Sequence, residues 1–240
     1  MRKFFLLVFL ACIHLSVSAQ KTFIHCGKLV DAKTAKLLSS KTIVIEGNKI
    51  VDVLDGFVSA GANDKTIDLK NSTVMPGLMD MHVHLEQETS PTRYMEGFTL
   101  NEADVAYGAI RFAERNLMAG FTSVRDLGGS GVNIALRKAI QKGYVVGPRI
   151  YTAGKSIATT GGHADPTNNY RKDLMGDPGP KEGVINGPED AYKAVRQRYK
   201  DGSDVIKITA SGGVLSMSAN GENPQFTEEE VKAIVSAAKD

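Results

Sequence analysis

Between Leu78 and the end of the chain, short apolar runs alternate with longer segments whose apolar residues recur at helical spacing. This alternation of strand and helix patterns predicts a parallel sheet or barrel. We expect strands at residues 78–84, 121–125, 149–153 and 204–210, and helices at residues 101–119, 132–142, 188–199 and 228–240. Thr99 with Glu102, and Thr227 with Glu230, have the spacing of a capping box at the start of the first and last of these helices.

The chain before Leu78 shows a different pattern, with β-branched runs between tight turns. Residues 42–46 and 49–53 flank Gly47-Asn48, and two such runs around a two-residue turn are typical of a hairpin. Further strands are expected at residues 22–29 and 66–69. No chemistry stands out in this part of the chain.

Two histidines stand at the end of the first apolar strand after the Pro76-Gly77 turn. Side chains alternate between the two faces of a strand, so His82, His84 and Asp80 are expected on one face. Two imidazoles so placed can bind one divalent metal ion. By itself, a His-x-His pair in a strand more often lies on the surface or in the core without binding a metal. The strand–helix units that follow favour a metal site at the end of a barrel strand.

The run from Met75 to His84 resembles the first-strand signature of the amidohydrolase superfamily, which comprises metal-dependent hydrolases on a (β/α)8 barrel. The likeness extends from about Thr22 to the last residue. It implies an α/β fold class: residues 76–240 form the first half of a TIM barrel, strands 1–4, and residues 20–75 form the N-terminal part of a small β-sandwich.

Half of a barrel would keep two unpaired sheet edges. We therefore expect the chain to be the front part of a longer protein of roughly 400 residues. A natural half barrel that dimerises is the alternative.

Lys207 lies in an apolar strand pattern, residues 205–209, where burying a bare ammonium group is costly. A desolvated lysine loses its proton readily, and a neutral amine can take up carbon dioxide to form a carbamate. The resemblance implies that the Lys207 carbamate bridges two metal ions and that His82 and His84 bind one of them. A lysine that reaches from a strand end into solvent is the alternative.

A centre of this kind holds two divalent metal ions, for which we expect zinc, with manganese and cobalt left open. It implies hydrolysis by a metal-activated water. In the family the second metal takes two further histidines, and a strand-eight Asp shuttles the proton. No histidine follows His163 in this sequence, so the catalytic residue and part of the ligand set are not in it.

The loops after the second, third and fourth strands also resemble one branch of the superfamily, related to imidazolonepropionases and dipeptidases. In that branch the histidine of the Gly161-Gly162-His163 segment contacts substrate, which gives His163 as a substrate-binding residue; a solvent-exposed loop histidine is the alternative. Arg125 and Asp126 are expected to form a structural ion pair that braces the site. Residues 211–214 are expected to face the substrate.

Residues 1–19 have the pattern of a signal peptide. A basic start precedes an apolar run that ends near Ile13, and residues 17–19 are small enough for cleavage after Ala19. The run is too short to span a membrane, so we expect an exported protein, periplasmic or secreted, without stable membrane insertion. A lipid anchor at Cys12 is the alternative.

Cleavage changes the charge and cysteine content of the chain. Loss of Arg2 and Lys3 leaves 27 basic residues (29 less two) against 27 acidic ones. With no basic cluster among aromatics, nucleic acid is not an expected partner. Cys26 remains as the lone cysteine, so an internal disulfide is excluded and the core must stabilise the fold.

The resemblance to this branch implies a hydrolase of amide bonds, most of all an exported dipeptidase of the Xaa-Pro type, acting on a dipeptide or another small molecule. Hydrolysis of cyclic amides such as imidazolones, of lactones or of phosphoesters is the alternative within the superfamily. An inactive fragment without catalysis is the alternative of another class. The resemblance leaves homo-oligomerisation open.

Overall fold

The computed structural model describes residues 20–213 and 221–240, so the predicted signal peptide lies outside the described residues. The chain divides into two compact units, Met1–Pro76 and Gly77–Asp240. The boundary predicted between residues 75 and 76 falls one residue before this division. None of the helices in the described part of the chain is both long and apolar enough to cross a membrane.

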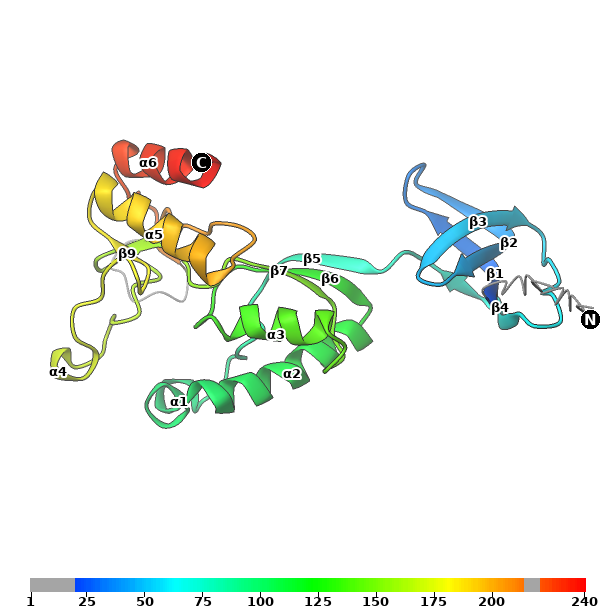
Figure 1. The fold of residues 1–240 in the computed structure, drawn as a ribbon, viewed down its shortest axis with the longest axis horizontal. Coiled ribbons are helices and arrows are strands. Elements are labelled where there is room, and N and C mark those ends of the chain that lie inside the picture. The colour runs from blue at the N-terminus through cyan, green and yellow to red at the C-terminus, as the bar shows by residue number, and fades with distance from the viewer. Residues whose placement is uncertain (1–19, 214–220) are drawn as a thin grey trace, which may run out of the picture. The chain divides into compact units, whose positions relative to one another are not determined.

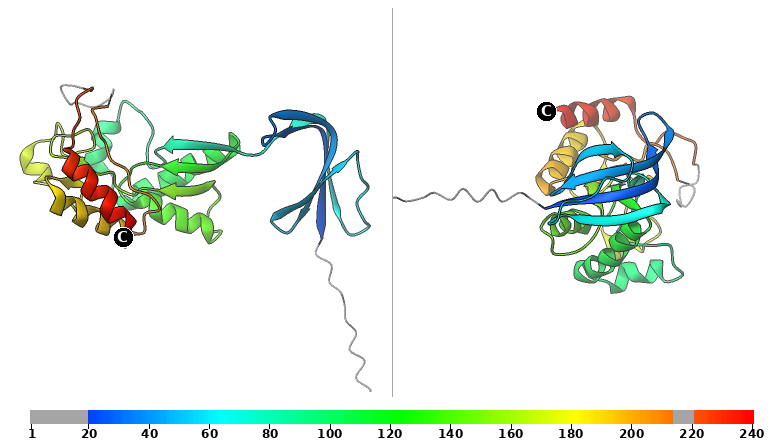
Figure 2. Two further views of the ribbon diagram at one scale, coloured as in Figure 1. Left: turned by 90° about the horizontal axis from the view of Figure 1, so that it is seen from above. Right: turned by 90° about the vertical axis from the view of Figure 1, so that its right-hand side faces the viewer.

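The first unit contains one four-stranded sheet with the order β3-β2-β1-β4 (Figures 1 and 2). Its strands are β1 (Lys21–Asp31), β2 (Lys36–Glu46), β3 (Lys49–Asp55) and β4 (Lys65–Val74). Strands β2 and β3 form the predicted hairpin, with Glu46 paired to Lys49, while β1 and β4 run parallel. Cys26, Leu29 and Ile43 form the core of this sheet, and Cys26 is free and buried.

The second unit is built on a parallel sheet with the order β5-β6-β7. The strands are β5 (Leu78–Val83), β6 (Phe121–Asp126) and β7 (Arg149–Thr152). Helices α2 (Glu102–Met118) and α3 (Val132–Gln141) cover one face of the sheet (Figures 1 and 2). The hydrophobic cluster between these layers contains Leu85, Ala109, Ala113, Val124, Val132, Leu136 and Ile150.

A second cluster lies under the last two helices, α5 (Pro188–Asp201) and α6 (Glu228–Lys239). The helices pack on Ile157 and Ile185 from the loop after β7. No element was expected between residues 153 and 188, but this loop contains a short parallel pair, β8 (Ala158–Thr159) and β9 (Val184–Ile185), and the short helix α4 (Lys172–Met175).

The predicted fourth strand, residues 204–210, is not formed as a regular strand. This segment makes a single isolated parallel bridge, between Ile208 and Ile157. The Ile157 amide donates to the Lys207 carbonyl at 2.8 Å, and the Thr209 amide donates to the Ile157 carbonyl at 3.1 Å. Within the described residues it therefore pairs on one side only, which is too little for a continuous ladder.

The start of the first long helix also differs from the prediction. The capping box joins Asn101 and Asp104 rather than Thr99 and Glu102. Thr99 is instead the last residue of α1 (Arg93–Thr99), a helix that the sequence analysis did not predict. The box predicted at Thr227 and Glu230 is present at the start of α6.

Candidate metal and substrate site

His82 and His84 lie together at the carboxyl end of β5. Their ring centroids are 5.4 Å apart and the ring planes meet at 62°. Nδ1 of His84 is 2.9 Å from the carbonyl oxygen of Gly128. Because a carbonyl only accepts hydrogen bonds, Nδ1 carries the donated proton, and in the neutral imidazole Nε2 then keeps its lone pair. This is the arrangement in which histidine serves as a metal ligand.

The pKa of His82 is lowered although much of its side chain is exposed. Partial desolvation of the ring is the largest cause, and electrostatic interactions with Lys207, His84 and Arg125 add to it, against the opposing charge of Asp80. The ring is therefore neutral at neutral pH, as metal binding requires.

Lys207 projects away from the helices that cover the last part of the chain. Its neighbours Ile206 and Ile208 pack against the α5–α6 cluster, and in extended backbone the residue between them points to the opposite side. Its charge is close enough to His82 to lower the pKa of that imidazole. The structure thus brings Lys207 toward His82.

Arg125 and Asp126 do not pair with each other, which corrects the predicted ion pair. Adjacent residues of a strand point to opposite faces. Nε of Arg125 donates to the Met81 carbonyl at 2.8 Å, whereas Asp126 is fully buried and accepts hydrogen bonds from Leu85, Gly128 and Asn133. Burial raises the pKa of Asp126, and these hydrogen bonds oppose the rise.

Glu86 is a site residue that the sequence analysis missed. Its carboxylate accepts from the Ser130 amide at 2.6 Å and from the Asn133 amide at 2.7 Å. The N-cap of α3 is Gly131, which has no side chain to satisfy the amides of the first turn. Glu86 takes that role from the loop after β5, and its negative charge complements the helix dipole.

His163 is exposed on the loop after β7, and contacts with Gln225 and Gly213 restrict its position. Its amide donates to Oε1 of Gln225 at 2.8 Å. A Cβ built on Gly213 would lie 2.2 Å from Cε1 of His163, so the ring rests directly on that glycine. Gly213 belongs to the predicted substrate-facing segment 211–214, of which residue 214 lies outside the described residues.

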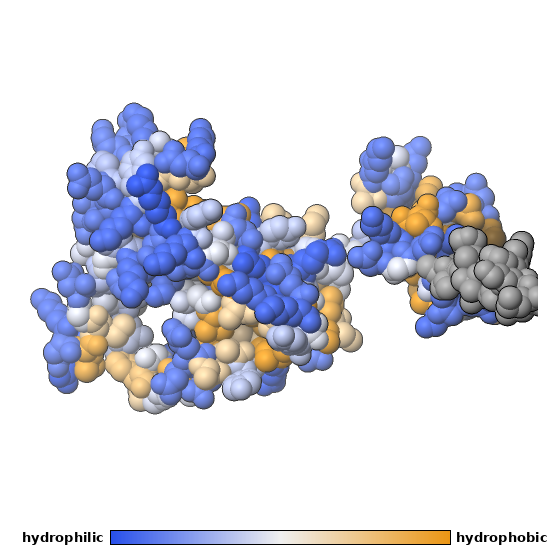
Figure 3. All heavy atoms as spheres, viewed as in Figure 1, coloured by the Kyte–Doolittle hydropathy of each residue, from blue (hydrophilic) through white to orange (hydrophobic). Residues whose placement is uncertain are grey.

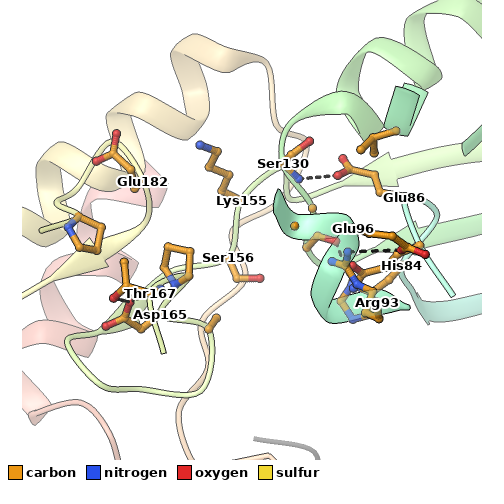
Figure 4. A pocket seen from close by; sticks show the side chains of 18 of the residues that line it. His84, Glu86, Arg93, Glu96, Ser130, Lys155, Ser156, Asp165, Thr167 and Glu182 are labelled. Atoms are coloured by element: carbon orange, nitrogen blue, oxygen red, sulfur yellow. Dashed lines mark hydrogen bonds and ion pairs between the residues drawn. The ribbon is translucent and has the colours of Figure 1, made fainter. Parts of the chain in front are cut away.

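A cavity of about 700 Å³ lies beside these residues. His84, Glu86, Arg93 and Glu96 lie on one side of it, Asp165, Thr167 and Glu182 on the other, and Lys155 and Ser156 between them (Figure 4). The cavity brings His84 and His163 together in one lining. His82 and Lys207 do not line it.

An aromatic cluster of Tyr94, Phe98 and Tyr170 joins α1 to the loop on the far side of this cavity. The Tyr94 and Tyr170 rings stack at 5.3 Å with 12° between their planes, and Phe98 meets Tyr170 edge-on at 5.1 Å. Gly97 allows this contact, because a Cβ there would lie 2.8 Å from the Tyr170 hydroxyl.

In residues 20–213 and 221–240, no three side chains of His, Cys, Asp or Glu are grouped to hold a metal ion. The described donors at the strand ends are therefore His82, His84 and, as a carbamate, Lys207. This set has the chemistry for a metal, with two imidazoles and one oxygen anion. That these residues bind metal, and that they are only part of the ligand set, both stay predictions.

Parallel strands with helices on one face and imidazoles at a strand's carboxyl end define the class of α/β-barrel proteins with their site at the strand ends. The chain belongs to the amidohydrolase family, whose sequence profile matches residues 73–240. The predicted superfamily and fold class are thereby confirmed, with a sandwich-like sheet preceding the barrel strands. Proteins of this family are generally metal-dependent.

The relatives include hydrolases of amide bonds. Ochratoxinase from Aspergillus niger is 31% identical over 238 residues, covering 92% of this chain and 48% of that protein. A crystal structure of a Xaa-Pro dipeptidase with methionine bound in its active site is 53% identical, with a TM-score of 0.87 over 92% of this chain and 54% of that one. A prolidase in complex with N-methylphosphonate-L-proline is 35% identical, with a TM-score of 0.80 over 92% of this chain and 54% of that one. The chain thus spans about half the length of these relatives.

Proposed function

We propose that the complete protein is an exported, metal-dependent hydrolase of amide bonds that acts on dipeptides. The observation that supports the proposal is that His82 and His84 lie together at the carboxyl end of β5, with Lys207 near enough to His82 to lower the pKa of its imidazole. These are the side chains that the sequence pattern singled out, and they come from segments more than 100 residues apart.

His82, His84 and a carbamate on Lys207 would hold divalent metal ions, for which we expect zinc. Metal ions at such a site polarise the scissile carbonyl and lower the pKa of water. Neighbouring groups of the chain orient one histidine and favour the neutral form of the other, as metal binding requires. The Gly128 carbonyl orients the His84 ring, and the surroundings of His82 keep its imidazole neutral.

His163 would contact the substrate at the opening of the cavity. The contacts with Gln225 and Gly213 restrict the place of its ring, while its side chain stays exposed. A fixed, exposed imidazole can donate a hydrogen bond to a peptide carbonyl or carboxylate. The cavity volume of about 700 Å³ is within the usual range for a small-molecule site.

The relatives support a dipeptide as the substrate. The Xaa-Pro dipeptidase, 53% identical to this chain over the part that the two share, binds methionine in its active site, and the prolidase binds N-methylphosphonate-L-proline. Export is supported by the signal-peptide pattern of residues 1–19. Mass spectrometry of the mature protein tests it, with Gln20 expected as the first residue.

The experiment measures bound metal and hydrolysis in the complete gene product. We expect about two zinc ions per chain and cleavage of dipeptides, Xaa-Pro among them, with activity lost on chelation and restored by zinc. Lys207→Ala should lose both properties, while Lys49→Ala, at an exposed lysine of β3, should keep both. Cleavage of cyclic amides without any dipeptide would overturn the dipeptidase assignment, and full activity without metal would overturn the metal site.

A second candidate is hydrolysis of an amide that is not a dipeptide, because the 31% identical relative is an ochratoxinase. Ochratoxin and an Xaa-Pro dipeptide, offered to the same preparation, separate the two. The dipeptidase proposal expects the higher kcat/KM for the dipeptide.

A further inference from the structure

A buried carboxylate lies behind the two histidines. Asp126 ends β6 on the face that α3 covers, and none of its surface is exposed. Among the described residues no ion pair compensates its charge. A carboxylate removed from water is costly unless hydrogen bonds replace its hydration. The groups that donate to Asp126 are therefore held tightly in place.

Two of those groups belong to the segments that position His84, namely the backbone directly after it and the turn after β6. Oδ2 of Asp126 accepts from the amide of Leu85 at 3.0 Å, directly after His84 in the chain. Oδ1 accepts from the amide of Gly128 at 3.2 Å and from Nδ2 of Asn133 at 3.0 Å. The carbonyl of Gly128 is the group that accepts from Nδ1 of His84 at 2.9 Å. One carboxylate thus holds the backbone that carries the imidazole and the residue that binds its ring.

The turn after β6 has little freedom to move away. The Leu127 amide donates to the Val83 carbonyl at 3.1 Å, and the Leu127 carbonyl accepts from Oγ of Ser156 at 2.9 Å. A Cβ on Gly128 would lie 2.6 Å from Oγ of Ser156 and 3.4 Å from Cε1 of His84. The carbonyl of Gly128 therefore has one place in the structure, and Asp126 holds it from the buried side.

We propose that Asp126 is a positioning residue that sets the tautomer and orientation of His84 through Gly128, so that Nε2 faces outward as a free acceptor. The consequence for metal affinity rests on the proposed function, whereas the tautomer does not. Partners in the second layer around a metal ligand typically change metal affinity by about 10–100-fold.

The test uses Asp126→Asn, which nearly keeps the volume of the side chain. Both carboxylate oxygens accept from N–H donors, so the amide nitrogen of asparagine would face a donor in either orientation. Val124→Ala is the matched control. Val124 is 2% exposed on the same face of the same strand, and its truncation removes packing without touching these hydrogen bonds.

Two measurements on the complete gene product decide the matter. The ring nitrogen shifts of His84 in metal-free protein report the tautomer, and competition with a chelator reports zinc affinity. We expect the Nδ1–H tautomer in wild type and in Val124→Ala. We expect a mixture of tautomers and about 10–100-fold weaker zinc binding in Asp126→Asn.

Unchanged tautomer and zinc affinity in Asp126→Asn would overturn the proposal, as would an equal loss of affinity in Val124→Ala. If Asp126→Asn does not fold, the wild-type spectrum still decides, because an Nε2–H tautomer there contradicts the role of Gly128. Absence of zinc binding in the wild type, with the tautomer as expected, would count against the proposed function alone.

Discussion

Asp165 fixes the loop that presents His163, through three hydrogen bonds. Its carboxylate accepts from the Gly161 amide at 2.8 Å, the Thr167 amide at 2.9 Å and the Thr167 hydroxyl at 2.7 Å. Burial alone would raise the pKa of Asp165, but these hydrogen bonds outweigh it and lower the pKa below the ordinary value of 3.8. The ionised form therefore stabilises the fold.

The pH dependence of this contribution has a definite sign. The unfolded chain takes up the proton near pH 3.8 and the folded chain only at lower pH, so the stabilisation is complete well above that pH and is lost as pH falls through the folded pKa. We expect Asp165→Asn to lower the free energy of unfolding by about 1–3 kcal/mol at pH 7, and by less at pH 3. Urea unfolding of both proteins at the two pH values measures this, and an equal difference at both would contradict it.

At the residue scale, the sequence predicted which side chains lie together better than it predicted the groups that form hydrogen bonds with them. Strand alternation was enough to place His82 beside His84, because the period of a strand is independent of its surroundings. It could not find the Gly128 carbonyl that orients His84, since a backbone group has no sequence signal. Glu86 was missed because its role depends on the amides of α3, some 45 residues away, being brought to it by the fold.

At the scale of elements, strong local patterns were predicted and elements that depend on neighbours were not. Strands β5, β6 and β7 follow their apolar runs closely. Residues 204–210 have an equally apolar pattern, but a strand also needs a partner along its length, and here the bridge at Ile208 is isolated. Helix α1 was missed because it has only seven residues and buries none of them, and a helix that short depends on its neighbours for stability.

The aromatic cluster explains how so exposed a helix stays in place beside the cavity. Tyr170 contacts both Tyr94 and Phe98 of α1. We expect Tyr170→Ala to make local opening of α1 easier by about 1–3 kcal/mol, because two aromatic pairs of about 0.5–1.5 kcal/mol each are lost. Hydrogen exchange of the α1 amides measures the change.

Tyr199→Ala is the control for this experiment. Tyr199 lies on α5, is 85% exposed, and has no ring partner among the aromatic contacts of the described residues. Its replacement should leave exchange in α1 unchanged. Equal exchange of α1 in the two variants would show that the cluster does not hold the helix.

At the scale of the whole molecule, apolar side chains remain exposed on the second unit. Tyr107 and Met118 of α2 are 77% and 78% exposed, and Tyr144 after α3 is 75% exposed. Figure 3 shows apolar side chains among polar ones on the visible face around α2 and α3. Scattered exposed apolar residues are ordinary on protein surfaces, so they do not by themselves identify a partner.

The predicted metal ligands, in contrast, allow a prediction about the complete protein. The described residues bring together two imidazoles and Lys207, with no group of three His, Cys, Asp or Glu side chains. The relatives are about twice as long as this chain. A two-metal centre needs more donors than these, so we expect the others from residues outside residues 1–240.

We therefore expect a chain of residues 20–240 to hold fewer than two zinc ions and to hydrolyse no dipeptide. The complete gene product is expected to hold two zinc ions and to hydrolyse dipeptides. Mass spectrometry of bound metal and a dipeptide assay on the two proteins provide the comparison. The same short chain with His82→Asn and His84→Asn reports metal bound elsewhere. Two tightly bound ions in the short chain, lost in that control, would place a whole centre within these residues and contradict the prediction that further ligands lie outside them.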